Sequence, residues 1–419
     1  MQLAPPERET PHPSELGGEK GKRGEDSKHL DESRRTRLYR AIRFEAQSHA
    51  KIILTREAMR MQRSGETDKT YLGDVFRTID CMQRRHGYFV KVNHHATFGT
   101  ASYAGLVTCG SVWACPVCAA KIQERRRTEI EQAMAWHTGN GGEAIMVTFT
   151  FPHYRFDTLP DLLTKQAQAF QFLRSPRVYK QLMKSLGFVG LVRSLEVTHG
   201  GNGWHPHTHE LWLVNPGVSE FHLRAQLAEL WANACHRAGL LPGRTIQEEP
   251  AFFAHSVDVR LDVQTGDYLA KQDDSRAWGL AAEVAKASSK AGRAKGVHPH
   301  HFLFRHDPGD DLRYLEYVKA MKGKRQLFWS HGLKARAGVL EVSDEELAER
   351  EEAGAVLLAA IPAPAWKYVT GNDARAELLD AVELAGFDGM CHLLRSLGVP
   401  KHHMPLTPTE YATRAEQAA

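Results

Sequence analysis

Apolar and polar positions alternate in the middle of the chain in runs that predict strands, and the stretches between these runs have helical spacing. The strand-like runs are residues 144–151, 190–198, 204–214 and 256–263, and the helical stretches are mostly 159–186 and 220–238. Alternation places one side of each strand against a core, while helical spacing of apolar residues is typical of a helix that packs on one side. We therefore expect an α+β fold, with a central antiparallel sheet and helices on its face.

The same patterns divide the chain into four segments. Residues 1–36 are rich in Pro, Gly and charged residues with few large apolar groups, a composition that predicts a disordered tail. Residues 37–130 begin with a predicted helix over residues 37–65 and continue into a cysteine-rich region. Residues 131–335 contain the alternating strands and helices, and the Ala-, Leu- and Glu-rich residues 336–419 predict a helical C-terminal extension.

Three histidines stand at alternate positions of one predicted strand, in the run Trp-His-Pro-His-Thr-His that ends at His209. Alternate side chains of a strand point to the same side, so His207 and His209 are neighbours there. The glycine-rich residues before this strand predict a turn centred near Gly201, and the resulting antiparallel hairpin brings Glu196 opposite His207. Two imidazoles and a carboxylate suit Mg or Mn beside a phosphate, and imidazoles also accept zinc. The alternative is structural histidines and a solvated glutamate.

These residues and two further motifs resemble the HUH (His-hydrophobic-His) endonucleases, in the branch that contains the replication initiators of rolling-circle plasmids. The corresponding segments are residues 145–153 for motif 1, 203–209 for motif 2 and 266–271 for motif 3. They occur in the family's order, and the similarity covers roughly residues 100–335. Two positions depart from the family's pattern. Thr208 stands where a hydrophobic residue is usual, and Gln272 stands where some relatives carry a further aromatic residue or a second tyrosine.

The resemblance implies the HUH fold and a DNA endonuclease and strand transferase that nicks one DNA strand. In such enzymes a tyrosine attacks a phosphodiester and stays joined to the 5′-phosphate, leaving a free 3′-hydroxyl, and motif 3 assigns this role to Tyr268. A phenol is a weak nucleophile at neutral pH unless the phosphate is polarised, which a metal at His207, His209 and Glu196 would do. Lys271 would lie one helical turn after Tyr268, where its ammonium group would favour the phenolate or hold the phosphate.

Other residues compete for parts of this chemistry. Tyr314 and Tyr317 are alternative nucleophiles, although their helical spacing among apolar neighbours favours a packed helix face. A glutamate that activates water ends the reaction cycle in some of these initiators, and Glu283 is a candidate, against an ordinary surface carboxylate. The second histidine cluster, residues 298–301, has no hairpin partner that carries a carboxylate, and it indicates a loop or a DNA-facing segment.

Three of the six cysteines lie close together in the sequence, at Cys109, Cys115 and Cys118. A Cys-x2-Cys turn after a third cysteine is typical of a zinc knuckle, in which a tetrahedral structural zinc ion holds a loop-rich segment together. The fourth ligand stays open between Cys81, His86, His94 and His95. The plasmid initiators that the chain resembles often carry a similar Cys-Pro-x-Cys segment. The alternative is three buried thiols that behave as small apolar side chains.

Composition and charge limit the class of protein further. A chain of 419 residues with 42% hydrophobic residues is ordinary for a globular protein, and a net charge of +4 does not by itself indicate nucleic-acid binding. The basic residues expected to grip DNA are Arg125, Arg126, Arg127, Lys290, Arg293, Lys322, Lys324 and Arg325. No signal peptide and no apolar run of membrane-spanning length are evident, so we expect a protein of the bacterial cytoplasm without membrane contact.

Three functions from different classes remain open. The first is a plasmid rolling-circle replication initiator that acts on a single-stranded or hairpin replication origin, together with host proteins such as a helicase and a polymerase. The second keeps the HUH chemistry in a transposase or a conjugative relaxase. The third is a non-enzymatic zinc-containing DNA-binding protein, in which the histidines are structural. The cysteine segment and the Trp-His-Pro-His run favour the first over the second.

Overall fold

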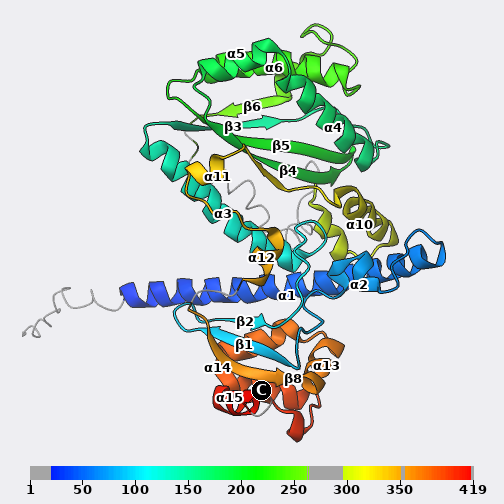
Figure 1. Cartoon of the computed structure of the whole chain (residues 1–419), viewed down its shortest axis with the longest axis vertical. Helices are drawn as coiled ribbons and strands as arrows, with labels where there is room; N and C mark the ends of the chain where they lie inside the picture. The colour runs from blue at the N-terminus through cyan, green and yellow to red at the C-terminus, as the bar shows by residue number, and fades with distance from the viewer. Residues whose placement is uncertain (1–19, 262, 264–295, 351–353, 417–419) are drawn as a thin grey trace, which may run out of the picture.

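The computed structural model describes residues 20–261, 263, 296–350 and 354–416. Two antiparallel sheets form the centres of its two parts, and the long helix α1 (Lys20–Arg63) runs between them (Figure 1). The α+β class expected from the sequence is confirmed. The sequence predicted one sheet, however, and the described residues form two.

The larger sheet has the strand order β6-β3-β5-β4-β7, and each neighbouring pair is antiparallel. The histidine-bearing strand β5 lies at its centre, because β3 pairs with one edge of β5 and β4 with the other. The five strands are β3 (Glu143–Phe149), β4 (Gly190–Gly200), β5 (Gly203–Val214), β6 (Val257–Arg260) and β7 (Leu327–Trp329).

Helices cover both faces of this sheet, because its strands bury side chains on both sides. On one face, Phe149 contacts Phe170 of α4 and Trp231 of α6. On the other face, Leu211 belongs to a buried cluster with Ile130 of α3. The surrounding helices are α3 (Pro116–Gly139), α4 (Leu159–Arg174), α5 (Arg177–Ser185), α6 (Glu220–Arg237), α7 (Pro250–His255), α10 (Pro308–Met321), α11 (Leu333–Arg336) and α12 (Asp344–Glu349), with the 3-10 helix η2 (Pro299–Phe304).

The smaller sheet pairs strands that lie far apart in the sequence. Its strand order is β2-β1-β8, and the C-terminal strand β8 pairs antiparallel with β1. Val90 and Val92 of β1 are fully buried in a cluster that includes Trp366 of α13. The elements of this part are β1 (Phe89–His95), β2 (Thr100–Ala104), β8 (Val356–Pro362), α13 (Ala363–Gly371), α14 (Arg375–Ser396), η3 (Lys401–His403) and α15 (Pro408–Glu416). The short helices α2 (Leu72–Val75) and η1 (Arg77–Ile79) contact α1, and Val75 and Ile79 are buried in the core of the larger part.

The division into four segments stays a prediction, and the elements near its boundaries are as follows. Helix α1 begins at Lys20, within the segment 1–36 for which composition predicts disorder. Helix α3 runs through residue 131, the expected start of the third segment, so the cysteine-rich region and the larger sheet share this helix. The residues after 335 are mainly helical, as expected, but they also supply β8. Among the described helices, none is long and apolar enough to cross a membrane.

Candidate functional site

Strands β4 and β5 form one long hairpin whose register brings the predicted metal ligands together. Glu196 lies directly opposite His207, which is the register that the sequence predicts. The turn depends on Gly203, which has a φ of 85°, in the left-handed region. A Cβ atom on Gly203 would also lie 3.1 Å from the carbonyl oxygen of Arg155, so a larger residue would push the turn away from its neighbour.

The two imidazoles and the carboxylate point at one place on the sheet. His207 Nε2 lies 3.2 Å and His209 Nε2 lies 3.3 Å from the same oxygen, Oε2 of Glu196. One ligand atom from each residue lies within 4.8 Å of the others, so the three could hold a metal ion. Burial raises the pKa of Glu196, but hydrogen bonds from both histidines outweigh burial, and the pKa lies well below its ordinary value. Glu196 is therefore a carboxylate at neutral pH, the form that binds a cation.

Hydrogen bonds on the far side of each ring orient the two imidazoles. Nδ1 of His209 lies 2.9 Å from Oγ1 of Thr148, its cross-strand neighbour on β3. Nδ1 of His207 lies 3.2 Å from the carbonyl oxygen of His205. A carbonyl only accepts, so Nδ1 of His207 donates, and a metal that displaces the proton from Nε2 would find the lone pair that it needs there. Metal-binding histidines ordinarily hold such a partner on the other nitrogen, so the donor set fits a metal ion.

Two more histidines continue the row of rings beyond His207. Ring centroids are 4.8 Å apart between His205 and His207, and 4.6 Å apart between His153 and His205. Burial, with smaller effects from His207 and His153, lowers the pKa of His205 to about 3, so this ring is neutral at pH 7. His153 belongs to the Pro-His pair of motif 1 and His205 to motif 2. Two of the three sequence motifs therefore meet at one end of the hairpin.

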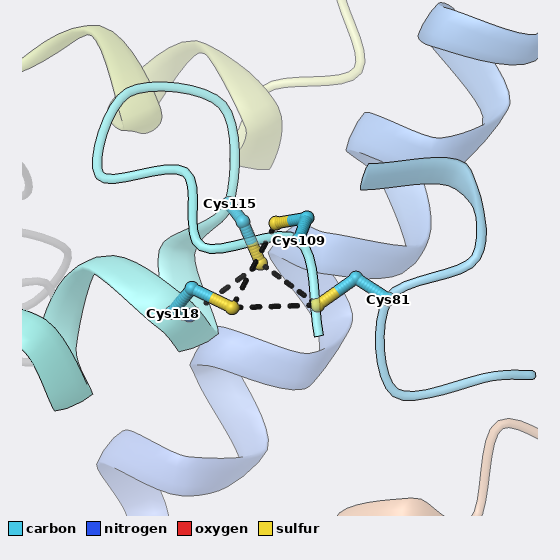
Figure 2. A group of neighbouring side chains, drawn as sticks. All are labelled: Cys81, Cys109, Cys115 and Cys118. Carbon is cyan, nitrogen blue, oxygen red and sulfur yellow. Dashed lines mark hydrogen bonds between the residues drawn. The ribbon is translucent and has the colours of Figure 1, made fainter. Parts of the chain in front are cut away.

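Four cysteines form a second group that could hold a metal ion, and Figure 2 shows their sulfur atoms turned toward one another. Sγ of Cys81 lies 3.4 Å from Sγ of Cys118 and 3.7 Å from Sγ of Cys115. Sγ of Cys109 lies 3.7 Å from Sγ of Cys118. Of the four candidates for the missing ligand, the structure brings Cys81 to the other three, and within the described ranges no histidine joins this group.

The contacts of Cys115 fit a thiolate better than a neutral thiol. Its sulfur accepts hydrogen bonds from the backbone N–H of Cys118, at 3.5 Å, and from Nε2 of Gln47, at 3.0 Å. Burial raises the pKa of Cys115, but hydrogen bonds from the other three cysteines outweigh burial and hold the pKa well below its ordinary value. Because the thiolate is the form that binds metals, the buried group of four sulfur atoms fits a cation at its centre.

The three arginines of α3 that were expected to grip DNA have partners within the chain. Arg125 donates to one carbonyl oxygen of α12 and to the carbonyl oxygen of the residue that follows α12. Arg126 pairs with Asp344 at 2.7 Å, and Arg127 pairs with Glu124 at 2.8 Å. Their contribution to DNA binding stays a prediction. The other described residues of that prediction, Lys322, Lys324 and Arg325, are exposed on the loop between α10 and β7.

Several predicted residues lie outside the described ranges: Tyr268, Lys271, Lys290 and Arg293, together with Gln272 and Glu283. Their roles stay predictions. The described chain stops at Val263 and resumes at Gly296. Val263 belongs to the buried cluster between the sheet and α3, and Val297 exchanges two backbone hydrogen bonds with His199 at the end of β4. Both ends of this stretch are therefore anchored to the sheet that carries the two histidines and Glu196.

The competing tyrosines are packed, as their helical spacing predicts. Tyr314 and Tyr317 on α10 are fully buried. Burial raises the pKa of both phenols well above its ordinary value, which disfavours the phenolate that a nucleophile needs. The sequence predicted a loop or a DNA-facing segment at residues 298–301. Most of these residues belong instead to the 3-10 helix η2, and His300 is fully buried and lies 2.6 Å from the carbonyl oxygen of Trp113.

Comparisons with known proteins give a family match and two relatives, and two of these three carry a replication description. A family model described as "Replication protein", Rep_1, matches residues 106–356, more than half of the chain. A protein named "Protein rep" from Streptomyces lividans is 29% identical over 361 residues, which cover 70% of this chain and 78% of that protein. A "Neomycin resistance protein" from Streptomyces cyanogenus is 34% identical over 141 residues, 28% of this chain and 32% of that protein. No solved structure matches the chain.

Proposed function

The chain belongs to the Rep_1 family of replication proteins, and we propose that it initiates rolling-circle replication of a plasmid by nicking one DNA strand at the origin. The family match agrees with the resemblance to plasmid replication initiators, and it favours replication over the transposase and relaxase alternatives. Nicking through a tyrosine is the finer part of the proposal, and the hairpin of β4 and β5 is the observation that carries it.

The hairpin supports nicking because its three polar side chains are arranged for a metal and not for packing. Glu196, His207 and His209 direct three ligand atoms to within 4.8 Å of one another at the centre of the sheet. Structural histidines would not need a shared carboxylate together with oriented outer nitrogens. The set leaves coordination positions for a phosphate oxygen, and a bound Mg or Mn ion would supply Lewis-acid polarisation of that phosphate.

In the proposed reaction, the phenol oxygen of Tyr268 forms a bond to the phosphorus of one phosphodiester. The bond from phosphorus to the 3′-oxygen breaks, and that oxygen leaves as a free 3′-hydroxyl after taking up a proton. The phenol loses its proton, and the ammonium group of Lys271 offsets the charge that develops on the oxygen or on the phosphate. Glu196, His207 and His209 would hold the metal, and Thr148 holds the ring of His209 in place.

The donor sets indicate different metals for the two groups. One carboxylate and two imidazoles suit Mg or Mn when phosphate is the substrate. Four thiolates suit zinc, which prefers tetrahedral sulfur sites and gives such sites a structural role. We therefore assign a catalytic Mg or Mn to the hairpin and a structural zinc to Cys81, Cys109, Cys115 and Cys118.

The proposed partners follow from the products of the reaction. A free 3′-hydroxyl serves as a primer, so a host polymerase would extend it. Displacement of the old strand requires unwinding, which a host helicase would provide. The substrate itself is the plasmid origin, in a single-stranded or hairpin form that exposes the phosphodiester.

Covalent attachment tests this function directly. Purified protein with Mg or Mn and a labelled single-stranded origin oligonucleotide should give a protein–DNA adduct, which mass spectrometry should map to Tyr268. Tyr268→Phe should abolish the adduct and leave DNA binding largely unchanged. Tyr88→Phe, at a phenol that is 55% exposed in the other part of the chain, is the matched control and should behave as the unaltered protein does.

Two other results would redirect the assignment. An adduct that persists in Tyr268→Phe would move the nucleophile to Tyr314 or Tyr317. His207→Ala and His209→Ala should lose cleavage that is not restored at metal concentrations sufficient for the unaltered protein. If both variants cleave normally, the histidines are structural, and the result favours the non-enzymatic DNA-binding alternative.

A further inference from the structure

A groove of about 830 Å³ lies beside the four cysteines, outside the hairpin site. One wall is the chain around Trp113, which connects Cys109 to Cys115, and another is the loop of residues 322–325 between α10 and β7. We call residues 322–325 the basic loop. Three aromatic side chains, Phe76, Trp113 and Trp329, line the groove together with the basic side chains.

Some of the basic side chains that line this groove form ion pairs, and others are exposed. Among the other basic side chains that line the groove, Arg77 pairs with Glu345 at 3.2 Å and Lys334 pairs with Glu129 at 3.1 Å. In the basic loop, the three cations are exposed, and among the described residues none of them has an ion-pair partner within 4.0 Å: Lys322, Lys324 and Arg325. Three open cations beside aromatic side chains are typical of a surface that binds a nucleic-acid backbone.

The basic loop is also joined directly to the sheet that carries the candidate metal ligands. Residue 326, which follows the loop, accepts a hydrogen bond through its carbonyl oxygen from the backbone N–H of Leu195, at 3.0 Å. Leu195 precedes Glu196 on β4. A strand of DNA in the groove would therefore run toward the edge of the sheet, next to the place where a phosphodiester would be cut.

Hydrogen bonds connect the cysteine segment to α10 and to the basic loop. Nε1 of Trp113 donates to the carbonyl oxygen of Lys324 in the basic loop, at 2.8 Å. The hydroxyl of Tyr314 on α10 donates to the carbonyl oxygen of Ala114, at 2.5 Å. Trp113 and Ala114 lie directly before Cys115, so the conformation of the cysteine group sets the position of both partners.

We propose that this groove binds the backbone of single-stranded DNA, and that metal binding by the four cysteines holds the basic loop in its binding position. The identification of DNA rests on the proposed function, while the groove and its link to the cysteines rest on the contacts above. A single strand is the occupant because its unpaired bases can stack on aromatic side chains, three of which line the groove, whereas the bases of a duplex are stacked on one another. Loss of the cysteine-bound metal would thus weaken DNA binding without touching the hairpin site.

Binding of a fluorescein-labelled, mixed-sequence single-stranded oligonucleotide to the full chain, followed by anisotropy without added Mg or Mn, tests the groove. The variant Lys322→Gln, Lys324→Gln, Arg325→Gln should bind about 10-fold more weakly at low salt. Its slope of log affinity against log salt should be smaller by about 2, since each phosphate contact to a single strand contributes about 0.7. The matched control removes three exposed cations from the C-terminal part, by Lys367→Gln, Arg395→Gln and Lys401→Gln, and should keep the slope.

The link to the metal needs its own variants. Cys118→Ser should lose zinc, measured by mass spectrometry of metals, and should bind the oligonucleotide as weakly as the basic-loop variant. Combining the two changes should add little, because both act on one surface. Trp113→Phe keeps an aromatic ring but removes the donor to Lys324, so it should keep its zinc and still lose several-fold in affinity.

Three results would overturn the proposal. Unchanged affinity and salt slope in the basic-loop variant would remove the groove from DNA binding. Unchanged binding by Trp113→Phe, or by a zinc-free Cys118→Ser that remains folded by circular dichroism, would remove the link to the metal. Stronger competition by a duplex of the same sequence would refute the single-strand assignment. Since no metal is added and no nicking is measured, these outcomes are independent of whether Tyr268 forms an adduct.

Discussion

At the scale of single residues, His207 and His209 differ from ordinary core histidines in the hydrogen-bond partner of Nδ1, the ring nitrogen that faces away from Glu196. Thr148 contacts His209 and a backbone carbonyl contacts His207, so both Nε2 atoms face Glu196. The neighbouring imidazole rings would repel one another if they were all protonated. Burial lowers the pKa of His205 and of His153, which keeps these rings neutral beside a metal site.

Thr148→Val tests the orientation of His209 with little change in volume. Removing the hydroxyl should free the ring of His209 and weaken Mn binding about 10-fold or more, as loss of a partner to a metal-bound histidine commonly does. Isothermal titration with Mn measures this affinity. Thr150→Val is the control, because the Thr150 hydroxyl contacts a backbone carbonyl on α7 and not a histidine. Equal affinities for the two variants would exclude the orienting role.

At the scale of elements, the cysteine group is assembled from parts of the chain that are distant in the sequence. Cys81 follows η1, Cys109 lies in the loop after β2, and Cys115 and Cys118 lie at the start of α3. A metal there would tie these three parts together where each has little regular structure of its own.

Cys81→Ser should therefore lower the zinc content of the purified protein by about one equivalent per chain, since structural zinc sites need all four ligands. Elemental analysis after dialysis measures this loss. Cys391→Ser is the matched control, because Cys391 is buried on α14 and is not part of the group. Full zinc content in Cys81→Ser would show that another residue is the fourth ligand.

Helices α1 and α10 are joined by a charged contact with its own pH dependence. Glu57 on α1, whose side chain is 7% exposed, accepts hydrogen bonds from Arg60 and from Lys319 of α10. The hydrogen bond from Arg60 is the largest cause, and with Lys319 it lowers the pKa of Glu57 below its ordinary value of 4.5. The unfolded chain then binds more protons than the folded chain as the pH falls below 4.5, so the stabilising contribution is present above that pH and is lost below it.

Glu57→Gln should lower the free energy of unfolding by about 1–2 kcal/mol at pH 7, because it replaces a charged acceptor. The difference from the unaltered protein should shrink as the pH falls below 4.5. Urea unfolding at several pH values measures both effects. Glu66→Gln, at an acceptor that is 46% exposed, should leave the free energy of unfolding nearly unchanged, because exposed ion pairs contribute little to stability. A constant difference at all pH values would contradict the assignment.

At the scale of the whole molecule, the smaller sheet brings together two segments that are far apart in the sequence. Strand β8 comes from residues beyond 335, and it pairs with β1 from the N-terminal quarter of the chain. Arg375 on α14 is fully buried and donates to Gln47 and Ser48 of α1, at 2.7 Å and 2.6 Å. The C-terminal segment is thus packed against the long helix instead of extending freely from the body.

Trp366→Ala should destabilise this part selectively. Trp366 is 2% exposed, and its Nε1 donates to the carbonyl oxygen of Gln83, so truncation should cost about 3–5 kcal/mol. Hydrogen exchange should rise in β1, β2 and β8 and stay unchanged in the larger sheet. Leu384→Ala, at a side chain that is 69% exposed, should leave both sheets as they are. Faster exchange throughout would mean that the two parts unfold as one unit.

Local patterns determined much of this protein. Alternating residues predicted β3, β4 and β5, and the glycine-rich turn predicted that Glu196 lies opposite His207, because a short turn between antiparallel strands leaves few registers. The spacing of Cys109, Cys115 and Cys118 predicted a metal group, because a Cys-x2-Cys turn brings two sulfur atoms to one point. These features depend on neighbours in sequence, so the sequence was enough to predict them.

Only the tertiary structure decided which distant residues join these local features. Cys81 competed with three histidines for the fourth position at the cysteines, and nothing local ranks candidates that lie between 14 and 28 positions before Cys109. The pairing of β8 with β1, and the hydrogen bond from Trp113 to Lys324, likewise connect segments separated by more than 200 residues. Such contacts form because each element must bury its apolar side against some partner, and the choice of partner depends on the packing of the complete chain.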